Sequence, residues 1–206
     1  MNPKLTRTIS GLYAITPDAL SLAALLPPLE ACIAGGVRIV QYRNKMSAPH
    51  AEILGALIPL CRRHGVALIV NDDIALAQLA DGVHLGKDDG DIATTRQRLG
   101  PDKIIGVSCY NSLPAALQAQ QAGADYVAFG SVFTSSTKPQ APRASLELLR
   151  EAKAQLHIPI VAIGGVTLQN APLAIAAGAD AVAVISSVFG TPDVKQAAQD
   201  FSNLFK

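Results

Sequence analysis

Two aspartates and three basic residues of this 206-residue chain have the types and positions needed to act together on an anion. Asp72 and Asp89 each follow a short apolar run, and Arg43, Lys45 and Lys138 follow others. If these runs are neighbouring parallel strands, the two carboxylates can share a hard cation that keeps several waters and takes its other ligands from a substrate phosphate. Magnesium fits that description, and three cations nearby indicate a polyanion larger than one phosphate.

Each of these residues also has a structural explanation. Asp72 or Asp73 could cap a helix, and Asp88 or Asp89 could cap a helix that starts near Asp91. A lysine at a strand end is usually a solvated surface charge. We assign Asp73 and Asp88 to capping or solvent, and Asp72 and Asp89 to the metal.

A second anion site is predicted further along the chain. Gly164 and Gly165 follow one apolar run, and Ile185 and Ser186 end the next. Backbone N–H groups of such a turn, together with the N-terminus of a short helix, form a phosphate site in many (βα)8 barrels. A Gly-Gly pair is equally typical of a tight turn, so both interpretations stay open here.

Covalent nucleophilic catalysis has little support. His84 lies inside an apolar run, where a hydrogen-bonded histidine in the core or behind the site is the favoured interpretation. The other histidines look structural, and no Ser/His/Asp or Cys/His arrangement emerges. The three cysteines are scattered and odd in number, which indicates neither a disulfide framework nor a zinc site.

The elements that must position these residues are short apolar runs at roughly even intervals, separated by segments with helical spacing. Eight runs are expected as strands: residues 12–16, 37–41, 67–70, 82–85, 104–108, 126–129, 160–163 and 181–185. Eight such units predict an α/β fold, a single (βα)8 TIM barrel over residues 1–206, in which catalytic side chains gather where strands end. The rival is an open doubly wound sheet, but the first strand lacks the Gly-rich loop typical of that fold.

An internal repeat supports this count. The sequence Ala-Gly-Ala-Asp at residues 122–125 recurs at 177–180, and residues 34–37 are a looser third copy. Each glycine can end a helix in the left-handed conformation before a strand begins. We therefore expect all three copies to be structural.

Composition limits the partners. The formal net charge is +1, so no broad basic face is available for nucleic acid or an anionic membrane. Hydrophobic residues make up 50% of the chain, but no apolar stretch is long enough to span a bilayer. We expect a cytoplasmic enzyme with small-molecule substrates, and a homo-oligomer is possible.

Seven short blocks of the chain, in order and at strand ends, resemble the thiamine phosphate synthase family. They comprise residues 41–45, 71–72, 84–89, 106–108, 135–138, 163–166 and 184–187. This family joins a hydroxymethylpyrimidine diphosphate to a thiazole phosphate, giving thiamine phosphate and diphosphate. The resemblance implies the same barrel and the same reaction for this chain.

The resemblance also implies roles for individual residues. Those implied to bind the pyrimidine diphosphate are Gln41, Tyr42, Arg43, Asn44, Lys45, Asn71, Ser108 and Lys138, with Arg43, Lys45, Ser108 and Lys138 in the catalytic role. Asp72 and Asp89 would hold Mg²⁺. Those implied to hold the thiazole phosphate are Ser135, Ser136, Thr137, Gly165, Ile185 and Ser186.

Departures from the family pattern are modest. Tyr42 replaces an expected Leu, Lys87 replaces an expected Gln, and Thr134 and Ser135 stand where Pro and Thr are usual. Ser135 keeps a hydroxyl, so phosphate binding is expected to survive with an altered loop geometry.

The residue inventory fits a dissociative displacement in which diphosphate leaves before the thiazole nitrogen attacks. Such a step needs positioning and charge neutralisation but no base. Two other functions stay open: a thiazole tautomerase or other phosphate-binding isomerase on the same barrel, and a non-catalytic binder that senses a phosphorylated ligand. Neither would release diphosphate in a magnesium-dependent manner.

Overall fold

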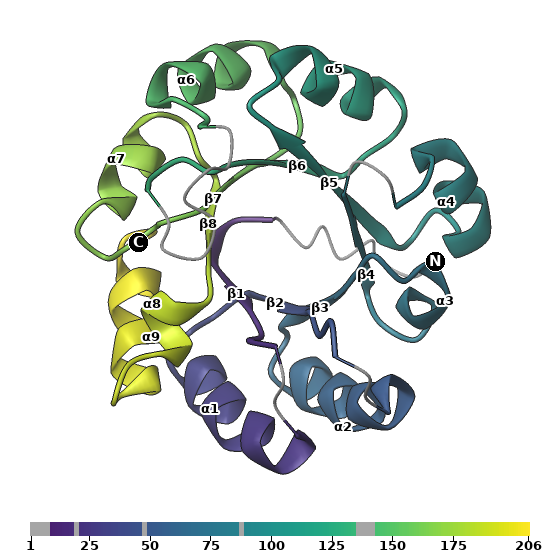
Figure 1. Cartoon of the computed structure of the whole chain (residues 1–206), viewed down its shortest axis with the longest axis vertical. Helices are drawn as coiled ribbons and strands as arrows, with labels where there is room; N and C mark the ends of the chain where they lie inside the picture. Colours follow the sequence, from purple (N-terminus) through teal and green to yellow (C-terminus); the bar gives the residue numbers. More distant parts are fainter. Residues whose placement is uncertain (1–8, 19–20, 47–48, 87–88, 135–142) are drawn as a thin grey trace.

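The computed structural model describes residues 9–18, 21–46, 49–86, 89–134 and 143–206. Eight parallel strands pair in sequence order, and β8 pairs with β1 to close a barrel (Figure 1). The strands are β1 (Gly11–Ile15), β2 (Ile39–Tyr42), β3 (Ala67–Asn71), β4 (Gly82–Leu85), β5 (Ile104–Tyr110), β6 (Tyr126–Phe129), β7 (Ile160–Ile163) and β8 (Ala181–Val184). The predicted (βα)8 barrel is confirmed, and the doubly wound alternative is wrong.

Helices surround the barrel (Figure 1). They are α1 (Leu22–Ala34), α2 (His50–Arg63), α3 (Ile74–Ala77), α4 (Ile92–Leu99), α5 (Leu113–Gln121), α6 (Leu146–Gln155), α7 (Ala171–Ala176), α8 (Ser186–Phe189) and α9 (Val194–Asn203). Six of them begin at a Ser or Asp whose side chain accepts a hydrogen bond from the first turn. Among the described helices, none has the length and apolarity needed to cross a membrane.

The N-caps of α3 and α4 show which of the aspartates near the strand ends act as helix caps. Asp73 accepts a hydrogen bond from the backbone N–H of Leu76 and caps α3, which confirms its predicted capping role. Asp91 itself caps α4, so Asp89 is free of that role. Asp88 lies outside the described residues.

Alternation along the strands produces two separate cores. Outward-facing residues pack beneath the helices in one large cluster, which contains Leu12, Val40 and Leu68. Inward-facing residues, among them Ile39 and Ile69, fill the barrel lumen in a second, smaller cluster. Burial on both faces explains why the strands read as nearly continuous apolar runs.

The repeated Ala-Gly segments are structural, as predicted. Gly36, Gly123 and Gly178 all have φ between 94° and 107°, a conformation that favours glycine. The aspartates that follow two of them hold the barrel together. Asp125 accepts a hydrogen bond from the backbone N–H of Ile105, and Asp180 accepts one from that of Ile160, so each ties its strand to the preceding one.

Candidate active site at the carboxyl rim

The polar residues predicted from the strand ends meet at one rim of the barrel. Gln41 lies in β2, Asn71 is the last residue of β3, and Ser108 lies near the end of β5. Parallel strands of a closed barrel all end at the same face, so residues far apart in sequence come together there. Ser135, Ser136, Thr137, Lys138 and Lys87 lie outside the described residues.

Asp72 and Asp89 form a carboxylate pair at this rim. The two carboxyl groups are close enough for Asp89 to affect the ionisation of Asp72, and Asp89 Oδ2 accepts a hydrogen bond from the backbone N–H of Gly86 at 2.7 Å. Burial, followed by the hydrogen bond and charge of Asp89, raises the pKa of Asp72 to about 6. Asp72 also has φ 64°, a left-handed conformation that is rare outside glycine.

Two adjacent carboxylates that repel each other fit a divalent cation. No group of three or more His, Cys, Asp and Glu side chains suited to a metal occurs within the described parts of the chain. The pair matches Mg²⁺, which binds through one or two carboxylates and keeps positions for water and substrate phosphates. Asp72 and Asp89 are therefore the described residues that can hold this ion.

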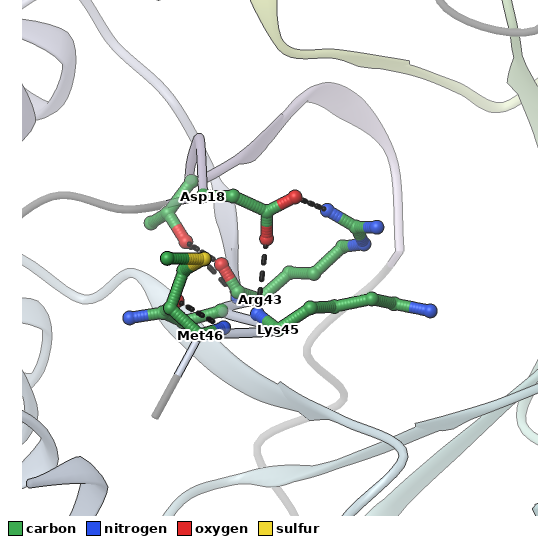
Figure 2. A network of polar contacts seen from close by, with 6 residues as sticks. Asp18, Arg43, Lys45 and Met46 are labelled. Atoms are coloured by element: carbon green, nitrogen blue, oxygen red, sulfur yellow. Dashed lines mark hydrogen bonds and ion pairs between the residues drawn. The ribbon is translucent and has the colours of Figure 1, made fainter. Parts of the chain in front are cut away.

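Arg43 and Lys45 are placed by Asp18, a residue that the sequence analysis missed (Figure 2). Asp18 Oδ2 accepts from Arg43 Nη1 at 2.6 Å, and Oδ1 accepts from the backbone N–H of Lys45 at 3.0 Å. Burial opposes ionisation of Asp18, but its hydrogen bonds and the two cations outweigh burial and lower its pKa. The side chains of Arg43 and Lys45 extend in the same direction (Figure 2).

The backbone of this segment is fixed from the end of β1. Thr16 Oγ1 accepts from the N–H of Arg43 at 3.0 Å and donates to its carbonyl at 2.9 Å. The charge of Lys45 lowers the pKa of both Asp18 and Asp72. An acidic residue soon after a strand was the signal that could have identified Asp18.

A pocket of about 480 Å³ opens beside the carboxylate pair. Its lining consists of Tyr42, Asn44, Lys45, His50, Val70, Asn71, Asp72, Asp73 and Leu76. Tyr42 faces away from the lumen, and its hydroxyl is 2.9 Å from Nδ1 of His50 on α2. The structure thus separates Tyr42 from Gln41, which faces inward, and brings Asn44, Lys45 and Asn71 together with Asp72.

Five polar side chains cross the lumen in one hydrogen-bonded series, which we call the lumen chain. Neighbouring polar atoms are 2.8–2.9 Å apart, in the order Gln41, Tyr13, Tyr126, His84 and Ser108. Burial lowers the pKa of His84 to about 4, against a smaller opposing effect of Asp89, so the imidazole is neutral at physiological pH. Burial likewise raises the pKa of both tyrosines, which keep their protons.

The lumen chain explains several features of the sequence. His84 is a hydrogen-bonded core histidine, the interpretation favoured above. Gly106 pairs with Tyr126, and a Cβ at Gly106 would lie 1.9 Å from the tyrosine ring. The β5–β6 register shifts between Ser108 and Tyr110, an irregularity of the kind that re-aims side chains next to active sites. The signal for Tyr13 and Tyr126 was a phenol at an inward position of an otherwise apolar strand.

Both glycines of the predicted phosphate loop are needed for the backbone conformation of the turn. Gly164 and Gly165 have φ 96° and 64°, and a Cβ at Gly165 would lie 2.3 Å from the carbonyl oxygen of Thr134. Ser187 donates its hydroxyl to the carbonyl of Val166, which ties this loop to α8. Within the described part of the chain, the backbone N–H groups of Gly165 and Ser186 have no hydrogen-bond acceptor. The geometry is thus a tight turn that also leaves donors for an anion.

Comparison with known proteins shows what this chain is similar to. A family model described as thiamine monophosphate synthase matches residues 12–188. The thiamine-phosphate synthase of Methylobacillus flagellatus is 56% identical over 201 residues, which are 96% of this chain and 96% of that protein. The one of Thiobacillus denitrificans is 52% identical over 95% of this chain and 94% of its own length. The solved structure of thiamine phosphate pyrophosphorylase from Pyrococcus furiosus has a TM-score of 0.85 and 35% identity, and the match covers 97% of this chain and 96% of that one.

Proposed function

Because this chain belongs to the thiamine-phosphate synthase family, whose members are transferases of thiamine biosynthesis, we propose that it makes its product by a dissociative displacement. The substrates are a hydroxymethylpyrimidine diphosphate and a thiazole phosphate. The observation that carries this proposal is the carboxylate pair Asp72 and Asp89 beside a pocket that Lys45 lines together with Asp72. An isomerase or a simple phosphate sensor has no leaving diphosphate whose charge must be neutralised.

The leaving diphosphate needs positive charge on several sides. Asp72 and Asp89 would hold a magnesium ion, which supplies part of that charge when bound. Arg43 is suited to grip phosphate oxygens through its planar fork, and Asp18 fixes its direction. Lys45 adds a second cation, and Lys138, outside the described residues, is proposed as a third.

Bond breaking leaves positive charge on the methylene of the pyrimidine, where the amino-substituted ring delocalises it. The thiazole nitrogen then attacks with its own lone pair, so no residue has to remove a proton. The chain must therefore orient two rings and exclude competing water. Gln41, Asn71 and Ser108 are proposed to face the pyrimidine diphosphate, with Tyr42 and Asn44 shaping the outer pocket.

The thiazole phosphate is proposed to bind at the Gly165 turn and the start of α8. Among the described residues, the backbone N–H groups of Gly165 and Ser186 donate to no acceptor, and this supports the assignment, because oriented backbone donors hold phosphate without a full positive charge. Ile185, Ser135, Ser136 and Thr137 complete the proposed cradle. A cytoplasmic location and a homo-oligomeric state both stay predictions.

A diphosphate-release assay tests the proposal. Release should require both substrates and magnesium, and it should stop when EDTA removes the metal. Deuterium on the pyrimidine methylene should slow the single-turnover reaction, because that carbon changes from tetrahedral to planar in a dissociative step. Release without magnesium would refute the metal role, and the absence of an isotope effect on the chemical step would refute the dissociative course.

A further inference from the structure

The hydrogen bonds of the lumen chain must all point in the same direction along it, from donor to acceptor. Tyr13 and Tyr126 are fully buried, and each hydroxyl oxygen contacts two other members of the lumen chain. A phenol has one proton, so a tyrosine that donates to one neighbour must accept from the other. A neutral imidazole obeys the same rule, because one ring nitrogen donates and the other accepts.

The number of available protons requires that one of the two end residues, Gln41 or Ser108, donates into the lumen chain. Four hydrogen bonds join the five members, and the three inner members supply three protons. The fourth proton must come from one end, either from the Gln41 amide or from the Ser108 hydroxyl. If Gln41 donates inward, Ser108 accepts from His84, and the hydroxyl proton of Ser108 is left for another acceptor. The two ends therefore offer opposite hydrogen-bonding character to the rim.

We propose that the lumen chain donates from Gln41 toward Ser108, and that Tyr13, Tyr126 and His84 are positioning residues for these two ends. In this direction the Gln41 amide nitrogen donates to Tyr13 at 2.9 Å, which leaves the amide oxygen to accept from another donor. His84 carries its proton on Nε2 and donates to Ser108 Oγ at 2.9 Å. The hydroxyl proton of Ser108 points to the substrates.

This direction rests on the proposed function, because both ends then complement the pyrimidine diphosphate. A hydroxyl beside a diphosphate must donate, since phosphate oxygens accept only. The aminopyrimidine carries an exocyclic N–H₂ group, which requires an acceptor such as the Gln41 oxygen. The opposite direction would set oxygen lone pairs against the diphosphate and two N–H groups against the amine. Buried mismatches of that kind leave polar groups unsatisfied and weaken binding.

The consequence is a specificity rule for the substrate class. The lumen chain holds the Gln41 amide in one orientation, because a flip would reverse every hydrogen bond as far as Ser108. The site should therefore accept an amino-substituted pyrimidine and reject the analogue that carries a carbonyl at that position. Sites built to bond a particular polar group discriminate strongly against its absence.

The direction can be read from the tautomer of His84 in the free protein. Nitrogen-15 shifts of the imidazole distinguish a protonated from an unprotonated ring nitrogen. Substituting His50, His64 and His157 by Asn, singly, assigns the remaining signal to His84. At pH 7.5 the proton should be on Nε2. A proton on Nδ1 would overturn the proposal.

Gln41→Glu tests whether the residue at position 41 sets the direction of the hydrogen bonds as far as His84. An ionised carboxylate can only accept, so Tyr13 must donate to it and each later bond must reverse. At pH 9 the proton of His84 should move to Nδ1, although the changed residue is three hydrogen bonds away. Asn44→Asp adds the same charge at the rim outside the lumen chain and should leave the tautomer on Nε2. An unchanged tautomer in folded Gln41→Glu, with its carboxylate ionised, would overturn the role of the inner residues.

The two proposals fail separately. The tautomer is measured without substrate, so it does not depend on turnover. Wild-type protein that releases diphosphate but carries the His84 proton on Nδ1 refutes only the direction of the lumen chain. If Gln41→Glu does not fold, the wild-type tautomer still decides the direction. Amino and carbonyl pyrimidine diphosphates then test the specificity rule, and comparable kcat/KM values for the two would refute it.

Discussion

Asp18 binds Arg43 through its side chain and Lys45 through its backbone, so one carboxylate fixes two neighbouring cationic residues at the rim. The pair Asp18–Arg43 is 2.6 Å apart and only partly exposed. Partly exposed ion pairs contribute little to stability, about 0–1 kcal/mol. The pair therefore matters through the direction in which it holds the guanidinium.

Asp18→Asn should lower kcat/KM for the pyrimidine diphosphate by up to about tenfold, with little change in the KM for the thiazole phosphate. The amide oxygen can still accept from Lys45, while the ion pair with Arg43 is lost. Asp102→Asn, an exposed change of the same charge between α4 and β5, should have no effect. Equal kinetics for Asp18→Asn and the parent would show that Arg43 needs no anchor.

Asp72→Asn should lower activity and raise the magnesium concentration needed for half-maximal rate. Asn tolerates the left-handed conformation of this position, so the change removes a charge with little backbone strain. Asp73→Asn is a matched control, because Asn also caps helices well and the charge change is the same. A magnesium titration of Asp72→Asn that matches the parent would exclude Asp72 as a ligand.

The raised pKa of Asp72 predicts how pH affects the metal-free protein. The folded state binds a proton there with a pKa of about 6, against a usual value of 3.8. This group therefore makes the free energy of unfolding increase as pH falls through this window. Magnesium must compete with the same proton, so its affinity should fall below about pH 6.

Thermal unfolding in EDTA measures the stability part of this effect. Asp72→Asn should be more stable than the parent at pH 7.5, and the difference should shrink by pH 4.5. Calorimetric titration with magnesium measures the other part. A stability difference that is independent of pH would mean that Asp72 does not titrate in this range.

Ser186→Asp should weaken the thiazole phosphate far more than the pyrimidine diphosphate. Ser186 is exposed at the start of α8, where an acidic residue is compatible with the helix but repels an anion. Gln199→Glu, an exposed change of equal charge on α9, is the control. Substitution at Gly165 is a poorer test, because any side chain there meets the carbonyl of Thr134. Equal weakening of both ligands would contradict a separate thiazole-phosphate cradle.

Gly106→Ala should destabilise the barrel by about 1–3 kcal/mol, because its Cβ overlaps the Tyr126 ring and forces the lumen to repack. Gly55→Ala in α2 meets no atom within 4 Å and should instead stabilise by up to about 1 kcal/mol. Denaturant unfolding of the two variants measures both effects. A Gly106→Ala protein as stable as the parent would show that Tyr126 can move aside without cost.

The sequence determined the fold and the end of the barrel at which the candidate site residues gather. All eight strands lie within two residues of the predicted runs, because burial on both faces leaves an unbroken apolar signal and each glycine turn is local. The gathering of polar residues at one rim could be predicted from the topology alone, because the parallel strands of a barrel all end at the same face. Asp72 and Asp89 are brought close enough there for Asp89 to raise the pKa of Asp72, as their strand ends suggested.

Only the tertiary structure decided how side chains pair across the barrel. Asp18 and Arg43 are 25 residues apart, and Tyr13 and Tyr126 are 113 residues apart. Local periodicity carries no information on such contacts, because strand order and register bring them together only when the barrel closes. Alternation along β2 decided that Tyr42 faces away from the lumen. The lumen chain forms only because five strands of the closed barrel each direct one polar side chain into the same lumen.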